Sequence, residues 1–354
     1  MAGAAVGRAQ VLAFRAARHG LHERRPQRRL RDAVAPFGIQ DTPPGTAATS
    51  IAARVDLDGP PPTDGLLVLW SLRGAPHLIV PGDHALFSLG VLPAEGTRQS
   101  LWRQPEDALV AVEKAMHAAL EKPMTKGELS TYVTGKVPPE LAPFCRACDA
   151  NHPSESIFRG APLLGRLVLE STSPVVVARA ATPATGDVDA LRTELLLRYL
   201  HAYAPTTSGH FAEWAGITKT DAKQRWVAVA DALVKVGKAF VLEEDLDELR
   251  RPSPVSGVRL VPNKDAYLQA RDRDLLFPDP AVRKKVFPML GGPGVVLVDG
   301  EPAATWRGTG KGKRYDIVVE PFTKLAKAAT ALLDDEAQRV ARARGHDEAS
   351  VTVR

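Results

Sequence analysis

Two helices followed by a β-hairpin recur along this chain, and this order restricts the fold more than any other feature of the sequence. Residues 46–55 are small and apolar, and the Pro43-Pro44-Gly45 corner before them suits the start of a helix. Residues 66–72 and 77–80 are apolar runs separated by Arg73-Gly74-Ala75-Pro76, so they predict two strands joined by a turn. Helices that lead into a hairpin make up a winged helix.

The same order returns twice more along the chain. In the second pass a Thr125-x-x-Glu128 capping box predicts the start of a helix. In the third pass Thr218-x-x-Asp221 has the same role. The other expected elements are helices at 108–120, 191–200 and 210–214, and strands at 165–168 and 175–178. The repetition predicts three winged helices in tandem, at residues 1–98, 99–185 and 186–238, the first with a basic N-terminal helix at 10–23.

After residue 238 the pattern changes to short strands separated by glycine, proline and charged residues. The expected strands are 239–242, 257–261, 294–298, 303–306 and 315–319. A closing helix is expected over residues 322–344. The sequence therefore predicts an α+β protein whose last part, residues 239–354, is a small β-domain of the barrel type.

Charge and composition fit a folded protein that binds a polyanion. The 354 residues include 44% hydrophobic and 25% charged residues, with a net charge of +5. The N-terminal part is rich in arginine, and these side chains either form a solvated face or contact phosphate: Arg8, Arg15, Arg18, Arg24, Arg25, Arg28, Arg29 and Arg31. No apolar run is long enough to span a bilayer, and two cysteines are too few for a disulfide framework. We expect a cytoplasmic protein.

Five segments, in order, resemble the AlkZ/YcaQ-type winged-helix DNA-binding family. They are residues 38–55, 69–87, 211–217, 267–287 and 296–308, and the resemblance extends from about residue 11 to about residue 345. The resemblance implies three tandem winged helices and a C-terminal β-barrel around duplex DNA. It also implies a bacterial, nucleoid-associated monomer that excises N-alkylated purines or unhooks interstrand crosslinks as a DNA glycosylase.

The resemblance places a catalytic motif, Gln-x-Gln or Gln-x-Asp, at the turn Gln40-Asp41-Thr42. Counted without gaps from Arg54, Gln40 takes the place of the first catalytic glutamine, and Thr42 stands where the second glutamine or the aspartate is expected. Hydrolysis of a glycosidic bond needs a positioned water and negative potential near an oxocarbenium-like sugar. Thr42 offers only a short hydroxyl. A one-residue gap would instead align Asp41 with the aspartate.

This departure leaves two functions open. One is an active glycosylase with Gln40 as the water-positioning residue. The other is a non-catalytic winged-helix DNA-binding protein, a regulator or a lesion-recognition protein, in which Gln40 caps the following helix or bonds a turn carbonyl. A protein-interaction scaffold that does not bind DNA is a third interpretation.

Basic residues at three places are the expected DNA contacts. Arg73 and His77 belong to the first hairpin, where Arg73 contacts DNA or, alternatively, pairs with Asp83 inside the fold. The helix that follows Thr218 has cations near its start, and a second hairpin has them at its tip: Lys219, Lys223, Arg225, Lys311 and Lys313.

No metal or cofactor is expected. Cys145-x-x-Cys148 followed by His152 has the spacing of metal ligands, but a structural zinc site needs a fourth ligand, and Asp149 and His210 are the candidates. The alternative is two small thiols beside a loop histidine. The glycine-rich segments 291–294 and 308–313 lack the spacing of a nucleotide-binding loop, so no nucleotide cofactor is expected either.

Overall fold

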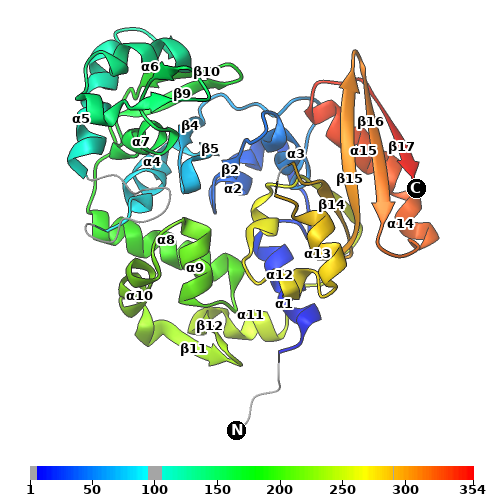
Figure 1. Ribbon diagram of the computed structural model, residues 1–354. Coiled ribbons are helices and arrows are strands. Elements are labelled where there is room, and N and C mark those ends of the chain that lie inside the picture. Colours follow the sequence, from blue (N-terminus) through cyan, green and yellow to red (C-terminus); the bar gives the residue numbers. More distant parts are fainter. Residues whose placement is uncertain (1–5, 95–105, 290) are drawn as a thin grey trace. The chain divides into compact units, whose positions relative to one another are not determined.

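The computed structural model describes residues 6–94, 106–289 and 291–354 (Figure 1). The chain divides into two compact units. Unit 1 contains residues 1–64, 199–207 and 231–354, and unit 2 contains residues 65–198 and 208–230. Each unit therefore combines segments that are far apart in the sequence. The boundary expected between residues 98 and 99 lies outside the described residues.

The N-terminal part of unit 1 is helical, as expected. Its helices are α1 (Arg8–Arg18), α2 (Leu30–Val34) and α3 (Thr46–Ala52). The short strand β2 (Ile39–Gln40) lies between α2 and α3, and β1 (Arg25–Pro26) pairs in parallel with β3 (Val55–Asp56). Helix α1 forms because Val11, Leu12 and Phe14 recur on one side, and all three are buried.

Unit 2 contains the first two expected hairpins in one sheet. They are β4 (Leu67–Trp70) with β5 (Pro76–Ile79), and β9 (Leu167–Thr172) with β10 (Val175–Arg179). Within the unit, β5, β4, β9, β10 and β6 (Met124–Thr125) are neighbours in that order. A single residue pair, Val68 opposite Leu169, joins the two hairpins. The sequence pattern gave no indication of this junction because it depends on residues about a hundred positions apart.

Two of the helices of unit 2, α6 (Lys126–Thr134) and α10 (Lys219–Val227), begin where the capping signals predict. The other described helices of the unit are α4 (His84–Phe87), α5 (Glu106–Ala119), α7 (Glu155–Gly160) and α9 (Ser208–Ala215), together with α8 (Val188–Tyr203) up to residue 198. Thr125 and Glu128 form the predicted capping box of α6. The Thr218 side chain accepts a hydrogen bond from the Asp221 N–H at the start of α10. The small hairpin of β7 (Phe144–Cys145) and β8 (Ala150–Asn151) lies between α6 and α7.

A third hairpin follows α10 in the chain and belongs to unit 1. Strand β11 (Leu233–Val236) pairs with β12 (Ala239–Leu242), so the expected boundary after residue 238 falls inside a hairpin. A turn at Gly237, with φ of +62°, folds the chain back between the two strands. Helix α11 (Leu246–Arg250) follows.

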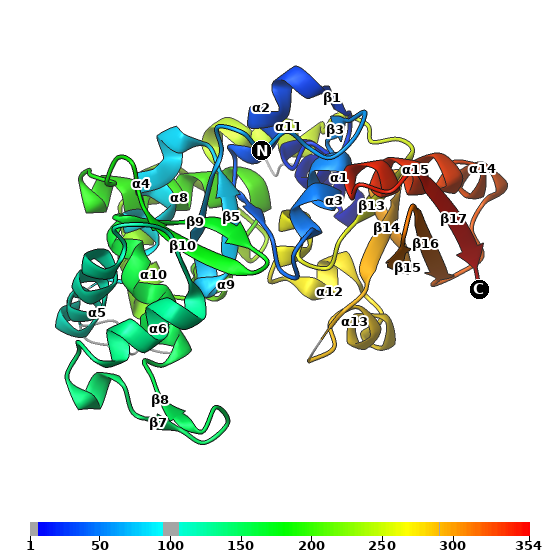
Figure 2. The same cartoon turned by 90° about the horizontal axis from the view of Figure 1, so that it is seen from above.

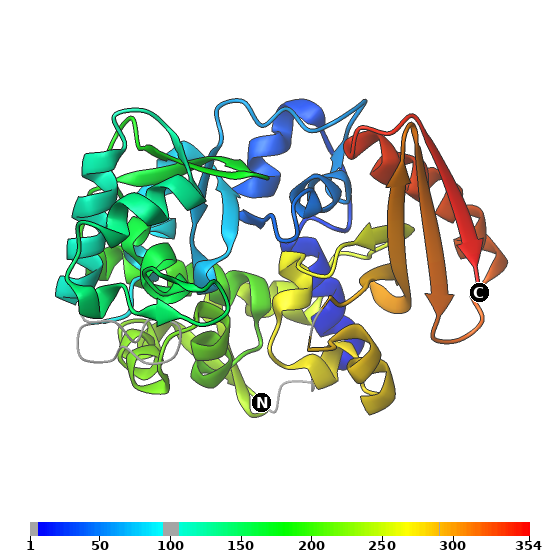
Figure 3. The same ribbon diagram turned by 45° about the horizontal axis from the view of Figure 1, so that its top comes forward.

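The expected β-barrel is wrong, because the C-terminal sheet is open. Its strands lie in the order β13 (Val258–Val261), β14 (Gly294–Val298), β15 (Glu301–Lys311), β16 (Arg314–Pro321) and β17 (Glu348–Val353). Strand β17, which was not expected, runs parallel to β16 and ends the sheet without pairing with β13 (Figure 3). The edges do not meet, so the sheet does not close.

Helix α15 (Leu333–Ala343) covers one face of this open sheet (Figure 1). Its buried Leu333, Ala337 and Val340 pack with Val296 and Ile317 of the sheet. The single helix expected over 322–344 is divided into α14 (Lys327–Ala331) and α15. The mixed α+β class is confirmed. Two short helices, α12 (Arg273–Leu276) and α13 (Pro280–Val286), connect β13 to β14. No helix in the described ranges has the length and apolar character needed to cross a membrane.

Candidate functional site

Gln40 ends strand β2, directly before the turn that leads into α3. Its side chain is partly exposed. Within the part of the chain that the structure describes, the Gln40 carboxamide makes no hydrogen bond to another protein group. The amide is therefore free to donate one hydrogen bond and accept another. It does not cap α3, which was the alternative role.

Asp41 provides the cap for α3 instead. Its carboxylate accepts a hydrogen bond from the Ala47 N–H at 3.0 Å, and the side chain is buried, with 8% exposed. Ala47 is the second residue of α3, and the residue at the N-cap position, Gly45, has no side chain with which to accept this bond. A carboxylate at the positive end of a helix is favourable. Asp41 thus fixes the turn to the helix.

Thr42 lies inside the same turn with an unsatisfied hydroxyl. Its Oγ1 is shielded from solvent, and no hydrogen-bond partner for it exists among residues 6–94, 106–289 and 291–354. An unpaired buried hydroxyl costs free energy. The sequence motif is therefore divided between three environments: an uncommitted amide, a capping carboxylate and an unpartnered hydroxyl.

The turn is held from the far end of unit 1 by Arg344, the residue after α15. Its guanidinium donates to the Gly45 carbonyl at 2.7 Å. Gly45 has φ of +86°, and a Cβ added there would lie 3.0 Å from the Arg344 guanidinium. Only glycine therefore allows this backbone conformation and this close approach together.

Arg54, two residues after the end of α3, forms a buried ion pair with Asp265 that was not predicted from the sequence. Arg54 donates from both terminal nitrogens to the carboxylate of Asp265, each at 2.7 Å, and its Nε donates to the His19 carbonyl at 2.7 Å. Burial alone raises the pKa of Asp265, but the attraction of Arg54 and its hydrogen bonds outweigh burial and lower that pKa. The only signal in the sequence was charge in two otherwise apolar segments.

His19 is buried beside this ion pair and is neutral. Burial, followed by the positive charge of Arg54, lowers the pKa of His19 to about 3. Its ring packs on Phe37, at 4.6 Å between centroids, and on Tyr203, at 4.9 Å. His19 is a structural residue that supports α1, and it lacks the exposure that chemistry would require.

Most of the N-terminal arginines are used in ion pairs and do not form a free basic patch. Arg15 is buried and pairs with Asp272 at 2.6 Å, and Arg24 pairs with Glu336 at 2.6 Å. Arg8 pairs with Glu301 at 2.7 Å, and Arg18 pairs with Glu248 at 2.7 Å and also with Asp245. The acidic partners lie more than two hundred residues away in the sequence, so neither of the two expected roles holds for these four arginines.

In unit 2, Arg73 and His77 face the protein. Arg73 has φ of +56°, and its guanidinium donates to the Trp214 carbonyl. His77 is 3% exposed and its Nδ1 donates to the Ala75 carbonyl at 2.8 Å. Burial lowers the pKa of His77 to about 4. The suggested pairing of Arg73 with Asp83 is wrong, because Asp83 binds Arg198 in a bidentate ion pair at 2.7 and 2.8 Å.

The basic start of α10 is divided between surface and interior. Lys219 and Lys223 are exposed. Arg225 is 6% exposed, pairs with Asp221 at 2.7 Å and donates to the carbonyls of Gly90 and Leu92, each at 3.0 Å. A guanidinium that is buried and fully paired has no surface to offer to DNA, so Arg225 is removed from the expected contacts.

The tip of the β15–β16 hairpin is less basic than its sequence suggests. Lys311 and Lys313 are exposed there. Lys313 pairs with Asp347 at 3.2 Å, and the adjacent Arg314 pairs with Asp316 at 2.7 Å. Exposed pairs of this kind are weak. Both lysines therefore remain accessible, but the neighbouring carboxylates of Asp347 and Asp316 lower the positive potential at the hairpin tip.

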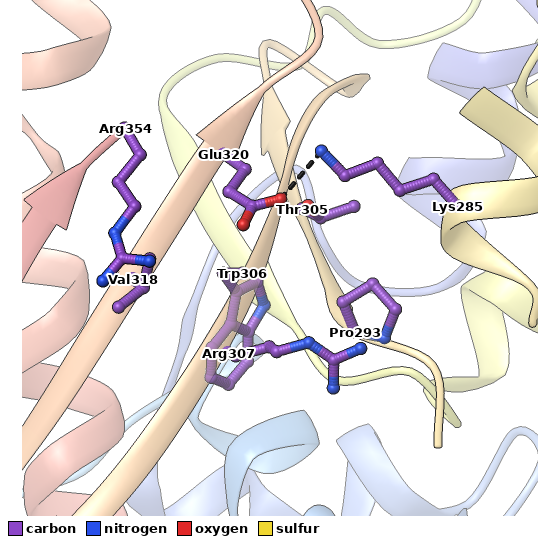
Figure 4. Close-up of a pocket in the computed structure, with 8 residues that line it drawn as sticks. All are labelled: Lys285, Pro293, Thr305, Trp306, Arg307, Val318, Glu320 and Arg354. Carbon is purple, nitrogen blue, oxygen red and sulfur yellow. Dashed lines mark ion pairs between the residues drawn. The ribbon is translucent and has the colours of Figure 1, made fainter. Parts of the chain in front are cut away.

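A pocket of about 210 Å³ lies against the open sheet of unit 1. Figure 4 shows Arg307 and Arg354 on its wall, with Lys285 and Glu320 joined by an ion pair of 2.8 Å. Because Lys285 and Glu320 offset one another, the two arginines give the wall a net positive charge. This pocket could not be predicted from the sequence, since its residues come from α13, the segment before β14, β15, β16 and the end of the chain.

Cys145, Cys148 and His152 do come together. One ligand atom from each residue lies within 4.8 Å of the other two, and no other group of histidine, cysteine, aspartate or glutamate side chains of this kind exists among the described residues. A hydrogen bond from the Cys148 backbone, together with the nearby His152 side chain, lowers the pKa of the Cys145 thiol to about 7. Neither Asp149 nor His210 joins the cluster.

The fold of the whole chain is similar to that of a solved DNA glycosylase structure. The structure resembles the solved structure of Streptomyces sahachiroi DNA glycosylase AlkZ, with a TM-score of 0.77 over 99% of this chain and 100% of that one, at 22% sequence identity. The family follows from the sequence. A family model described as DNA glycosylase AlkZ-like matches residues 37–343, so the chain belongs to the AlkZ-like DNA glycosylase family, and the resemblance found in the sequence is confirmed.

A curated relative matches over a shorter length. The chain is 32% identical over 158 residues to an interstrand DNA cross-link repair glycosylase of the bacterium Streptomyces sahachiroi. This alignment covers 42% of the chain and 41% of the relative, so the chain matches about two fifths of that protein's length.

Proposed function

We propose that this protein is a monofunctional DNA glycosylase that binds duplex DNA and hydrolyses the glycosidic bond of N-alkylated purines, including those held in interstrand crosslinks. The observation that supports this function best is the uncommitted carboxamide of Gln40 at the turn that the family motif occupies. Family membership and the crosslink-repair relative support DNA as the substrate.

In this proposal Gln40 positions the attacking water. Its amide oxygen accepts a hydrogen bond from the water, and its NH₂ group holds the water or a sugar oxygen. A water bound here would also satisfy the unpartnered hydroxyl of neighbouring Thr42, which would recover the cost of burying that group. Thr42 then acts as the second, weaker hydrogen-bonding residue.

Asp41 contributes in a different way. One of its oxygens accepts from the Ala47 N–H, so the carboxylate holds the turn while its negative charge lies next to Gln40. A fixed anion near an oxocarbenium-like sugar stabilises the positive charge that develops as the base leaves. This electrostatic stabilisation is modest. It is sufficient for cationic alkylated purines, because a cationic base is a good leaving group.

A base-release assay tests the proposal. The full chain is incubated with a duplex that carries one N7-methylguanine, and abasic sites are revealed by alkaline strand cleavage. We expect cleavage by the unchanged protein and a loss of roughly 100-fold in the single-turnover rate of Gln40→Ala. The matched control is Gln27→Ala, since Gln27 is exposed and lies outside the turn. Equal rates for the unchanged protein and Gln40→Ala would place the chemistry elsewhere.

The second candidate is a non-catalytic DNA-binding protein of the same fold. Thr42 favours it, because a hydroxyl shielded from solvent stands where the family motif has an amide or a carboxylate. In that case the protein would retard the alkylated duplex in a gel but release no base. The assay therefore distinguishes the two functions in one preparation.

A further inference from the structure

The β7–β8 hairpin brings three metal-ligating side chains together outside the proposed glycosylase site. Cys145 lies opposite Ala150 in the hairpin, Cys148 occupies the turn, and His152 follows β8. The Cys148 N–H donates to the Cys145 carbonyl at 3.2 Å, and the His152 N–H donates to the Pro143 carbonyl at 3.3 Å. Backbone bonds therefore hold each of the three residues in place.

The separation of the ligand atoms suits a tetrahedral ion. Zinc bonds of about 2.3 Å to sulfur and about 2.0 Å to nitrogen place neighbouring ligand atoms roughly 3.3–3.8 Å apart. The two sulfurs and one histidine nitrogen already lie within 4.8 Å of one another. Since Cys148 is exposed in a turn, small side-chain rotations close the remaining gap.

His152 is already oriented as a ligand. Its Nδ1 donates to the Pro153 carbonyl at 2.8 Å, which leaves the lone pair on Nε2. Nε2 is shielded from solvent and has no hydrogen-bond partner in the described ranges. A metal-binding histidine typically donates its other ring nitrogen to a carbonyl or carboxylate in this manner.

A redox role explains the two cysteines less well. Reactive Cys-x-x-Cys pairs generally lie at the start of a helix, whereas here both cysteines belong to a hairpin and are not bonded to each other. A dithiol switch also gives no reason for the orientation of His152. The geometry favours a metal over a disulfide.

The hairpin also lacks the apolar core that would hold it. Figure 2 shows β7 and β8 in a segment that projects beyond α6. Phe144 is 58% exposed, and Cys148, Ala150 and Asn151 are exposed as well. Small excursions without a core are commonly stabilised by a metal ion or a disulfide.

We propose that Cys145, Cys148 and His152 bind one Zn²⁺ ion, with the fourth position left to a water molecule. Two thiols release their protons to solvent on binding, so the two thiolates, the neutral imidazole and the ion together carry no net charge. The hairpin connects α6 to α7, whose N-cap, Ser154, stands two residues after His152. The ion therefore fixes the segment that enters α7.

The test measures metal on the full chain. Protein purified in reducing buffer is analysed for zinc by mass spectrometry, and the metal-free form is titrated with Co²⁺. We expect one zinc per chain and the visible absorption bands of tetrahedral Co²⁺ with sulfur ligands. In Cys148→Ser and His152→Gln we expect Zn²⁺ affinity to fall by more than about 100-fold, because each removes a ligand. Arg146→Ala is the control, since Arg146 is an exposed turn residue between the cysteines.

Circular dichroism shows whether each variant is folded, and thiol alkylation provides a second readout. In the unchanged protein, modification of Cys145 and Cys148 should release zinc to a chromogenic chelator. Three results would overturn the proposal: reduced, folded protein without zinc or a cobalt spectrum, unchanged affinity in Cys148→Ser, or a Cys145–Cys148 disulfide as the only form found.

Discussion

The carboxylate of Asp41 accepts a hydrogen bond from the N–H of Ala47 at 3.0 Å, across the turn where we propose the catalytic residues to lie. Two roles are therefore separated within three consecutive residues. Asp41 holds the start of α3, and the Gln40 carboxamide is left available. Substitutions at the two positions should affect different properties, which gives a sharp test of the site.

Asp41→Ala is expected to reduce stability more than chemistry. Removal of a helix-capping acceptor typically costs about 0.5–2 kcal/mol. Asparagine can accept the same bond, so Asp41→Asn should keep the midpoint of urea unfolding close to that of the unchanged protein. Base release per folded molecule should remain within about tenfold in both variants, in contrast to Gln40→Ala. A normal unfolding midpoint for Asp41→Ala would contradict the capping role.

Local features of the fold could be predicted from the sequence, and distant pairings could not. The capping box of Thr125 and Glu128 depends on residues three apart, so its pattern is visible in the sequence. Strand β17 escaped prediction because its partner is β16, where Val351 lies opposite Ile317 across the intervening α15. The predicted barrel is wrong for a related reason. Strand β17 forms one edge of the sheet and does not pair with β13 at the other edge, so the sheet stays open.

Charge was the property that the sequence analysis misjudged most. Arg15 and Arg24 were counted as surface cations, although they bind Asp272 and Glu336 inside unit 1. A sequence shows the sign of a charge but not the distant partner that neutralises it. For the proposed catalytic turn, the resemblance pointed to Gln40, and only the structure distinguished the environments of Asp41 and Thr42.

The buried ion pair of Arg54 and Asp265 is expected to be a major determinant of stability. Asp265→Asn leaves the buried Arg54 guanidinium without its counterion, and breaking such pairs typically costs about 3–5 kcal/mol. The matched control is Asp56→Asn, because Asp56 pairs with Arg339 on the surface and exposed pairs contribute only about 0–1 kcal/mol. Urea unfolding at neutral pH should separate the two variants clearly.

The effect of Asp265→Asn should also depend on pH. The pKa of Asp265 is lowered in the folded state, so its contribution is complete above the unfolded value, about 3.9, and is lost as the pH falls through the folded pKa. The difference in unfolding free energy between the unchanged protein and Asp265→Asn should therefore be constant near neutral pH and shrink in strong acid. A difference that grows in acid would have the wrong sign.

His19 is expected to make the protein acid-sensitive in a higher pH range. Its folded pKa is about 3, whereas an unfolded histidine titrates near 6.5. Below about pH 6.5 the histidine is protonated in the unfolded chain but stays neutral in the folded chain. This group therefore lowers the free energy of unfolding by up to ~1.4 kcal/mol for each pH unit of acidification. His19→Phe should reduce that slope by about one proton. An unchanged slope would show that His19 is not buried as a neutral ring.

A second histidine should have the opposite effect. The hydrogen bond and charge of Asp245 raise the pKa of His201, so this group adds stability below its unfolded pKa and loses it as the pH rises through the folded value. His201→Gln should therefore lose stability in mild acid and little above neutral pH. The same series of unfolding curves compares the two histidines directly.

The two exposed lysines of α10, Lys219 and Lys223, provide a test of DNA contact. Arg225 of the same helix is buried, so its substitution should affect stability and not DNA binding. If Lys219 and Lys223 each contact a phosphate, changing either to alanine should weaken duplex binding and reduce the slope of log affinity against log salt by about 0.9. Lys114→Ala is the charge-matched control, since Lys114 is an exposed lysine of α5 in the same unit. Arg225→Met should instead lower the unfolding midpoint, because it breaks the buried pair with Asp221. Fluorescence anisotropy at several salt concentrations measures the slopes. Equal slopes for Lys114→Ala and Lys219→Ala would show that only net charge matters, and the start of α10 would then lose its assignment as a DNA contact.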